Sequence, residues 1–386
     1  MNKFRRDVWA SRGAERFVKI QLIIGPGGAI VCAASVGTSG VNIMKQTLSL
    51  AILLACCVLS PVAVRAHHSG SEYDRTIVEI EGRLLEVAWQ NPHVHFIVRA
   101  TDPNGKVLTW DIEANSLSIL RRTDATPENL KVGDTIKIAG APSRRATNRM
   151  WAMNILTANG REIVLGPGMP PRWQKTALGA KSTWFEGGTA ANKTAGIFRV
   201  WSTKFGEPGG LWRRDYPLTE AARKARAAFN PLTDSVAPGC RPKGMPTIME
   251  QPYPIEFVNK GDTILLRMEE YDTVRTISMA PNANLDSLPK TLLGRSKGRW
   301  EGDTLVVTTS RIDWPYLDPS GIPQGASSTI VERITPTSDG TRLSYTMTIT
   351  DPATFTEPLE LKRSWVWRPG ETVKPYNCVE ARRSQR

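Results

Sequence analysis

Histidine is scarce in this chain, and it is confined to one stretch. The 386 residues include four histidines, and all of them fall between His67 and His95. Imidazole is the commonest protein ligand for copper, zinc and nickel, so this concentration favours a metal site. No histidine follows residue 95, which excludes a histidine-dependent hydrolase in the C-terminal half.

The motifs of the common enzyme and nucleotide-binding classes are also missing. The sequence contains no Walker loop, Rossmann glycine pattern, G-x-S-x-G elbow or H-E-x-x-H pair, so we expect no nucleotide cofactor. The formal net charge is +13, but lysine and arginine are spread along the chain without a block. That spread argues against a nucleic-acid partner. The sequence reveals no reaction, and it leaves open whether the protein is an enzyme.

Long apolar runs are rare, and the longest has the form of a signal peptide. Residues 48–59 are almost wholly apolar, a short basic region from Met44 precedes them, and small residues lead up to Ala66. The run is too short for a comfortable membrane span. We predict a Sec signal peptide over 44–66, cleavage after Ala66, and a periplasmic or secreted protein without an integral membrane span.

The 43 residues before Met44 are unusual, because a signal peptide normally begins the chain. We expect Met44 to be the true start and residues 1–43 to be a mis-annotated or disordered leader. An unusually long leader is the alternative. Cys56 and Cys57 raise the further alternative of a lipoprotein anchor, although Leu54 stands where a smaller residue is usual.

Cleavage after Ala66 would make His67 the first residue of the mature chain. An N-terminal histidine can chelate copper through its amine and its ring nitrogen, and His93 or His95 would complete the site. This arrangement resembles the mature starts of lytic polysaccharide monooxygenases and of periplasmic copper carriers. The second histidine comes sooner than in most monooxygenases, and the strands do not follow their immunoglobulin-like sandwich. The resemblance therefore implies a metal preference and no activity.

Carboxylates with the same spacing accompany the second histidine pair. His93 and His95 alternate in NPHVHF, and Asp111 and Glu113 alternate in TWDIE, so on strands each pair points to one face. A carboxylate there can ligate a metal or orient a histidine from outside the ligand shell. We predict a metal site, with copper favoured over zinc, formed by His67, His68, His93, His95 and Glu113. The alternative is a solvated chain start followed by histidines that bond only the backbone.

Residues 67–166 are predicted to form a small β barrel. Three alternating strands, a short helical segment and further strands follow one another, an order that matches an OB-like Greek-key barrel. The predicted elements are 77–88, 93–100, 106–113, the helical segment 115–121, then 132–140, 149–157 and 162–165. Because Asn91-Pro92 interrupts the sheet just before His93, we expect the imidazoles at the rim of the barrel.

The rest of the chain is predicted to be a connection followed by a second β domain. Residues 167–239 form an irregular, tryptophan-rich connection with one short helix that Thr219 caps. Residues 240–386 contain about eight alternating strands, typical of an antiparallel β barrel or curved sheet, with a lipocalin-like barrel as one form. Cys240 and Cys378 are the cysteines left after cleavage, and in an oxidising compartment we predict a disulfide between them.

Several charged residues fall on the predicted strands of the second domain: Glu256, Glu269, Glu270, Arg275, Arg299, Glu332 and Arg333. Alternation alone does not tell which of them point inward. We expect surface ladders, while two charges inside a barrel would indicate a functional site.

Longer segments resemble a known family. HHS after the signal sequence, WQNPHVHF, TWDIE and KVGDTIKIAGAP are similar to a family of uncharacterised exported proteobacterial proteins with the pattern HHS, NPH and W-x-x-E. GCRPKGMPTIMEQPYPIEF, GRSKGRWEGDTLVVTT, TITDPATF and the late YNC resemble the companion β domain that such proteins often carry. The resemblance implies export and draws attention to His67, His68, His93 and Glu113, but it brings no activity.

Three classes of function fit these patterns. The first is a periplasmic metal-binding protein, which requires the four histidines to converge. The second is a metal-free module that binds an apolar or sugar-like small molecule in the C-terminal barrel, which requires an enclosed apolar cavity between residues 250 and 370. The third is an enzyme that uses carboxylates such as Glu256 and Glu332. The sequence does not determine the ligand, the oligomeric state or a macromolecular partner.

Overall fold

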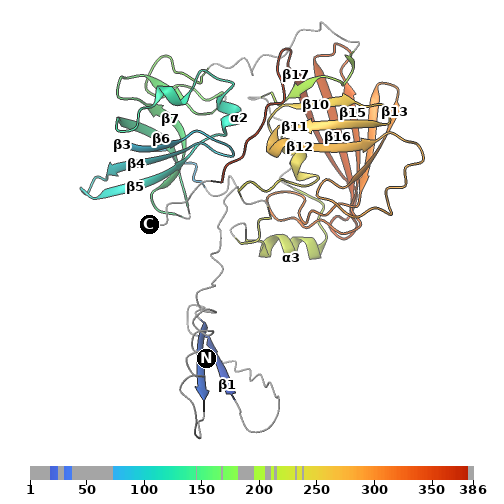
Figure 1. Ribbon diagram of the computed structural model, residues 1–386, viewed down its shortest axis with the longest axis horizontal. Helices are drawn as coiled ribbons and strands as arrows, with labels where there is room; N and C mark the ends of the chain where they lie inside the picture. Colours follow the sequence, from blue (N-terminus) through green and yellow to red (C-terminus); the bar gives the residue numbers. More distant parts are fainter. Residues whose placement is uncertain are drawn as a thin grey trace, which may run out of the picture. The chain divides into compact units, whose positions relative to one another are not determined.

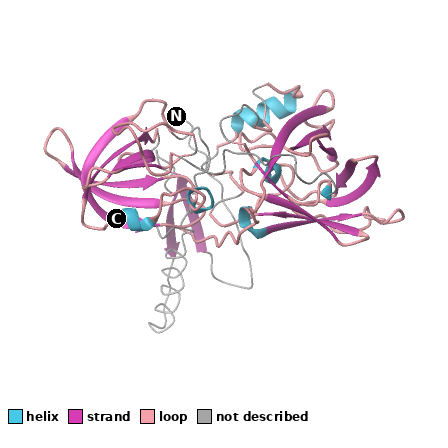
Figure 2. Cartoon of the chain, turned by 90° about the horizontal axis from the view of Figure 1, so that it is seen from above, coloured by secondary structure: helices cyan, strands magenta, loops and turns pink. Residues whose placement is uncertain are grey.

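The fold is mainly β, as predicted, and it is described from a computed structural model. The structure describes residues 18–24, 30–36 and 73–380, apart from 145, 167, 181–194, 205–209, 213–214, 231–232 and 237–238. Figure 2 shows that strands are the main regular element, joined by loops, and that the helices are short. Near the start, β1 (Val18–Ile24) and β2 (Ile30–Val36) pair antiparallel.

The first large unit of structure is a six-stranded sheet in which five strands close into a barrel and one is added at the edge (Figure 1). Its strands run in the order β5-β4-β3-β6-β7-β8, and a parallel pairing of β5 with β7 closes it. The elements are β3 (Val78–Ala88), β4 (His95–Thr101), β5 (Val107–Glu113), helix α2 (Leu117–Leu120), β6 (Thr135–Pro142), β7 (Arg149–Leu156) and β8 (Glu162–Val164). Three strands, a helix and further strands in this order confirm the predicted OB-like barrel.

Alternating apolar side chains fill this first barrel. Leu84, Phe96, Val98 and Ile112 are fully buried, and they pack in one cluster with apolar residues of β6, β7 and β8. The residues between them on β4 and β5 therefore face outward. His95 and Glu113 belong to this outward set, so the candidate site is built on the outer face of the barrel wall.

The tryptophan-rich segment supplies part of the second barrel. Within it, β9 (Val200–Ser202) pairs with both β10 and β17, and the indole of Trp201 is fully buried in the second core. Helix α3 (Glu220–Ala228) lies where predicted, and the hydroxyl of its N-cap Thr219 accepts a hydrogen bond from the Ala222 amide. None of the described helices is long and apolar enough to cross a membrane.

The second barrel is closed by nine strands, in the order β10-β11-β12-β13-β14-β15-β16-β17-β9. Neighbours are antiparallel except β12 and β13, which pair in parallel. After β9, the strands are β10 (Ile255–Asn259), β11 (Thr263–Met268), β12 (Thr273–Ser278), β13 (Arg295–Glu301), β14 (Thr304–Ser310), β15 (Thr329–Pro336), β16 (Arg342–Thr350) and β17 (Leu359–Trp367). The barrel alternative of the prediction is confirmed, with β9 as an additional strand.

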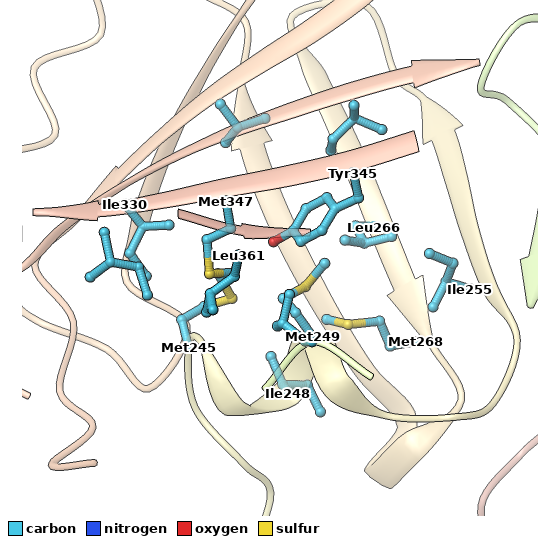
Figure 3. Packing of buried hydrophobic residues seen from close by; sticks show 14 of the residues in the cluster. Met245, Ile248, Met249, Ile255, Leu266, Met268, Ile330, Tyr345, Met347 and Leu361 are labelled. Atoms are coloured by element: carbon cyan, nitrogen blue, oxygen red, sulfur yellow. The ribbon is translucent and has the colours of Figure 1, made fainter. Parts of the chain in front are cut away.

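A short segment plugs the interior of the second barrel. The 3-10 helix η5 (Thr247–Glu250) brings Ile248 and Met249 against Tyr345, Met347 and neighbouring apolar residues, as Figure 3 shows. These four side chains are at most 1% exposed. The Met249 carbonyl also accepts a hydrogen bond from Arg363, which fastens the plug to β17. The interior around η5 is thus packed with the protein's own side chains.

Part of the expectation of surface ladders was wrong. Glu256, Arg299 and Arg333 do lie on the surface, in ion pairs with Arg267 or Glu301. Arg275 and Glu332 instead form an ion pair inside the barrel, where their side chains are at most 1% exposed. Glu269 and Glu270 are also buried, at 0% and 4% exposure. Glu269 and Glu270 follow the end of β11, and each of these buried charges has a partner of opposite sign, as buried charges require.

The C-terminal tail is linked covalently to the chain between α3 and η5. Cys240 and Cys378 form the predicted disulfide, closing a loop over a sequence separation of 138 residues. In the chain-entropy account such a loop stabilises the fold by about 4–5 kcal/mol. Residue 378 also forms a parallel bridge with Asn91, so the disulfide ends beside the NPH motif.

Candidate functional site

The candidate site is built where β4, β5 and β7 lie side by side. The strand register places His95 opposite Glu113, and Glu113 opposite Trp151. Directly paired residues point to the same face of a sheet, so these three side chains share the outer face. Asp111 and Arg149 form the next pair in the same direction. The parallel pairing of β5 with β7 therefore brings His95 and Glu113 next to Arg149 and Trp151.

Glu113 is the centre of this group. Its side chain is 9% exposed and forms an ion pair with Arg149 through Oε1. The hydroxyl of Tyr73 donates to its other oxygen, Oε2, at 2.9 Å. Residues 73 and 74 reach this position because they pair with the end of β6, through a bridge to Ser143 and a hydrogen bond to the Pro142 carbonyl. Both carboxylate oxygens are therefore engaged by protein groups.

His93 lies just before β4 and its ring orientation is fixed. Its Nδ1 is 3.1 Å from the Ala114 carbonyl oxygen. A carbonyl only accepts, so the neutral ring carries its proton on Nδ1 and its lone pair on Nε2. The ring also packs edge-on against Trp151, with centroids 5.1 Å apart. This is the arrangement by which proteins commonly orient a metal-binding histidine, with one nitrogen donating to a carbonyl.

His95 lies between two carboxylates. Its Nδ1 is 3.6 Å from Asp111 and its Nε2 is 3.7 Å from Glu113 Oε1. These distances suit electrostatic attraction but exceed those of a good hydrogen bond. Asp111 is half-exposed, whereas the His95 side chain is 18% exposed. His95 is therefore reachable from solvent at the edge of a partly buried, negatively charged surface.

The charge states at the site favour a cation. Burial lowers the pKa of His93, more than the attraction of Glu113 raises it, so the imidazole is neutral at pH 7. Burial alone would raise the pKa of Glu113, but Arg149, the two histidines and Tyr73 together hold it below its usual range. A neutral imidazole beside an ionised carboxylate is the protonation state that metal binding requires.

The structure brings together part of the predicted metal set. His93, His95 and Glu113 interact with one another electrostatically, whereas His67 and His68 lie outside the described residues. Within the part of the chain that is described, no three His, Cys, Asp or Glu side chains are arranged to hold a metal ion. The complete set of five therefore stays a prediction, because two of its members cannot be placed.

Three residues of the site were not found from the sequence. Arg149 and Trp151 belong to β7, far along the chain from the histidines, and join them only through the β5–β7 pairing. Asn91 of the NPH motif is fully buried, and its side chain contacts Ser118 and the C-terminal tail. In the sequence, Asn91 before Pro92 indicates only a turn. No local pattern predicts that the C-terminal tail contacts it.

Comparison with known proteins adds a family without a known activity. Residues 54–150 match a family of unknown function, DUF6152. The matched region contains all five predicted metal residues and extends from the apolar run of the predicted signal peptide to the start of β7. No curated protein matches this chain.

The lowered pKa of His93 predicts that acid destabilises the fold. The unfolded imidazole takes up a proton near its ordinary value of 6.5, while the folded one resists protonation to lower pH. The stabilising contribution is therefore present above pH 6.5 and is lost as pH falls below it. We expect a loss of about 1 kcal/mol in the free energy of unfolding between pH 7.5 and 5.5.

Urea unfolding of the wild type and of His93→Gln at both pH values measures this contribution. Glutamine can still donate to the Ala114 carbonyl but does not titrate, so the variant should lose less stability on acidification. Titrating groups that do not interact with residue 93 contribute equally in both proteins and cancel, so the difference reports His93 together with its coupling to Glu113. Equal losses would contradict the assignment of the neutral, buried imidazole.

Proposed function

We propose that this protein is exported and binds a transition metal ion, copper in preference to zinc. The ligands are drawn from His67, His68, His93 and His95, with Glu113 as the supporting carboxylate. The observation that carries this proposal is the convergence of His93 and His95 on Glu113, beside Tyr73. We assign no reaction to the site.

Chain length supports a contribution from the two remaining histidines. Tyr73 contacts Glu113, and His67 and His68 precede it by six and five residues. Each residue spans at most about 3.3–3.6 Å, so the connection is long enough, at up to about 20 Å, to reach any part of the site. The same length limits both imidazoles to within about 20 Å of Tyr73.

Glu113 acts in this proposal from outside the ligand shell. Its two oxygens already accept from Arg149 and Tyr73, so a metal ion ligated directly would have to share an oxygen with one of these donors. As a fixed negative charge it favours a cation and lowers the cost of placing one near Arg149. Of the two roles open to the carboxylate from the sequence, orientation and charge compensation are the better supported.

Copper is favoured over zinc by the expected N-terminal chelate. Amine and imidazole nitrogens suit copper(II), which also binds most N and O sites more tightly than zinc does. Export follows from the predicted signal peptide with cleavage after Ala66. The Cys240–Cys378 disulfide supports an oxidising compartment, because such bonds persist in the periplasm or outside the cell.

The two alternative functions have less support. A ligand-binding C-terminal barrel needs space, but the side chains of η5 and of the strands around it pack against one another (Figure 3). Carboxylate catalysis needs an accessible acid or base, but Glu332 is fully buried against Arg275 and Glu256 is paired with Arg267. The metal site therefore remains the function that the described contacts favour most.

Copper(II) titration of the protein processed to begin at His67 tests the proposal. Calorimetry should give one copper per chain, and electron paramagnetic resonance should show nitrogen ligands. The control retains Val64-Arg65-Ala66 ahead of His67. A three-residue extension is chosen because a single added residue would place His68 third, where it would create a different terminal copper site.

We expect the extension to weaken copper binding by about 100-fold or more, since each tenfold corresponds to only about 1.4 kcal/mol and the amine chelate is lost. His93→Gln should weaken it as well, which separates the folded site from the chain start. Binding by the processed protein that is no tighter than that of a short His-His peptide would overturn the proposal.

A further inference from the structure

The C-terminal tail forms hydrogen bonds with the NPH motif. The Asn91 side-chain amide donates to the Tyr376 carbonyl at 2.6 Å, and the Val379 amide donates to the Asn91 carbonyl at 2.9 Å. The Gln90 side chain reaches the Val379 carbonyl at 3.4 Å. Residues 376–379 thus lie along residues 90 and 91 of the first barrel, two positions before His93.

The Asn91 side chain also bonds helix α2, which follows the segment that orients His93. Its Oδ1 accepts from the Ser118 amide at 3.0 Å and its Nδ2 donates to the Ser118 hydroxyl at 3.1 Å. Ser118 lies on α2, directly after the segment whose Ala114 carbonyl fixes the His93 ring. One buried side chain therefore joins the tail, the helix and the histidine turn.

The tail is held there by one covalent bond in addition to these hydrogen bonds. Cys378 lies between the two tail residues that contact Asn91 and is joined to Cys240. Both cysteines are partly exposed, and Asn377 and Val379 beside the second one are exposed. A reducing dithiol can therefore approach the bond without prior unfolding of the barrel.

We propose that the Cys240–Cys378 disulfide is a redox latch on the histidine site. When a dithiol transfers two electrons and two protons, the S–S bond breaks, two thiols form, and the dithiol becomes a disulfide. Residues 377–379 then lose their covalent anchor, the contact between the Val379 amide and the Asn91 carbonyl loosens, and the turn that orients the ring of His93 is less firmly held. The effect on metal affinity rests on the proposed metal function.

Reduction of the disulfide releases only a short segment of the tail, so the expected change in copper affinity is moderate. Upstream of the cysteine, the Lys374 amide still donates to Glu269 and the Tyr376 amide to Asp272. Only the segment after Tyr376 is released, so Asn91 keeps its side-chain contacts and loses the contact with the Val379 amide. Coupling between two sites commonly changes affinity by 5- to 150-fold, and we expect copper binding to weaken by about tenfold.

A double-mutant cycle in the processed full chain tests the coupling with copper(II) as the probe. Cys240→Ser with Cys378→Ser gives the open form without any reductant, which would itself bind copper. Asn91→Ala keeps the disulfide and the backbone contact with Val379, but it removes the side chain that ties residue 91 to Ser118 and Tyr376 and so passes the effect on. Each should weaken copper binding about tenfold, and together they should cost little more than either alone. Full additivity, or unchanged affinity in the serine variant, would overturn the latch.

Amide hydrogen exchange without metal gives an independent readout. In the serine variant, the amides of Ser118 and Val379, which donate to Asn91, should exchange at least about tenfold faster. Amides of β16, far from the tail, should not change, which would show that the variant is folded. Faster exchange together with no copper binding in any form would retain the latch and reject the metal function. Unchanged exchange would reject the latch whatever the metal result.

Discussion

Replacing Glu332 by alanine is expected to lower the free energy of unfolding by about 3–5 kcal/mol, since a buried charge loses its partner. Glu332 and Arg275 lie inside the second barrel, and both side chains are essentially inaccessible to water. Few other single substitutions in this chain should cost as much.

The cost arises because Arg275 has no other anion inside the barrel among its described contacts. Its guanidinium donates to Glu332, to Ser296 at 3.0–3.1 Å and to Thr309 at 2.7 Å. Burial lowers the pKa of Arg275, but Glu332 more than offsets this and holds the pKa above its ordinary value. Without the carboxylate, two hydroxyls remain to solvate a full positive charge. The Tyr345 hydroxyl, which donates to Glu332 at 2.7 Å, also loses its acceptor.

Urea unfolding at pH 7 measures this effect, and a surface pair provides the matched control. Glu256 bonds Arg267 at 2.7 Å on the outside of the same barrel, so Glu256→Ala should cost less than about 1 kcal/mol. Combining Glu332→Leu with Arg275→Met should recover much of the loss, because the charge is removed with its partner. If Glu332→Ala cost no more than Glu256→Ala, the buried pair would not carry the assigned stabilisation.

The fold could be predicted well because both barrels depend on local alternation. Segments such as 342–350 and 359–367, which alternate between apolar and polar residues, became β16 and β17 with those bounds. The strand that was missed, β9, is three residues long, too short for a period of two to be recognised. It forms a strand because it pairs with β10 and β17. No local sequence pattern encodes this long-range pairing.

Charge placement shows the limit of the same reasoning. Alternation separates two faces but does not say which face is inside when a strand carries both apolar and charged residues. Arg275 on β12 and Glu332 on β15 are inside because each neutralises the other. Each of these two residues is buried beside a partner that lies 57 positions away in the sequence. Two inward charges would indicate a functional site by the sequence argument, yet these two are bonded to each other and to neighbouring hydroxyls and are better explained as structure.

The candidate site was predictable in its histidines but not in its surroundings. Four histidines in one stretch, and the shared spacing of His93 with His95 and of Asp111 with Glu113, are visible in the sequence. The contacts that set their charge and orientation come from closure of the barrel, which delivers Arg149 and Trp151. Asn91 owes its role to a tail almost three hundred residues later.

Replacement of Glu269 by alanine is the second substitution for which we expect a loss of about 3–5 kcal/mol, because the buried Arg122 loses its fully buried anionic partner. Glu269 follows β11 in the second barrel, and its fully buried carboxylate accepts from Arg122 at 2.6 and 2.8 Å and from Arg121 at 2.5 Å. It also accepts the Lys374 amide at 3.0 Å. The Glu269 carboxylate of the second barrel thus bonds both the C-terminal side of α2 and the tail.

The matched control is Glu371, which is more exposed and bonds the same arginine. Arg122 donates to Glu371 at 3.0 Å through Nε, and Glu371→Ala leaves Glu269 in place, so it should cost less than half as much as Glu269→Ala. Thermal and urea unfolding of both variants measures the difference. Equal costs would show that the two carboxylates share the charge of Arg122 evenly. A larger cost for Glu269 would identify it as the anchor that keeps α2, and through Ser118 the Asn91 contact beside the histidines, in register with the tail.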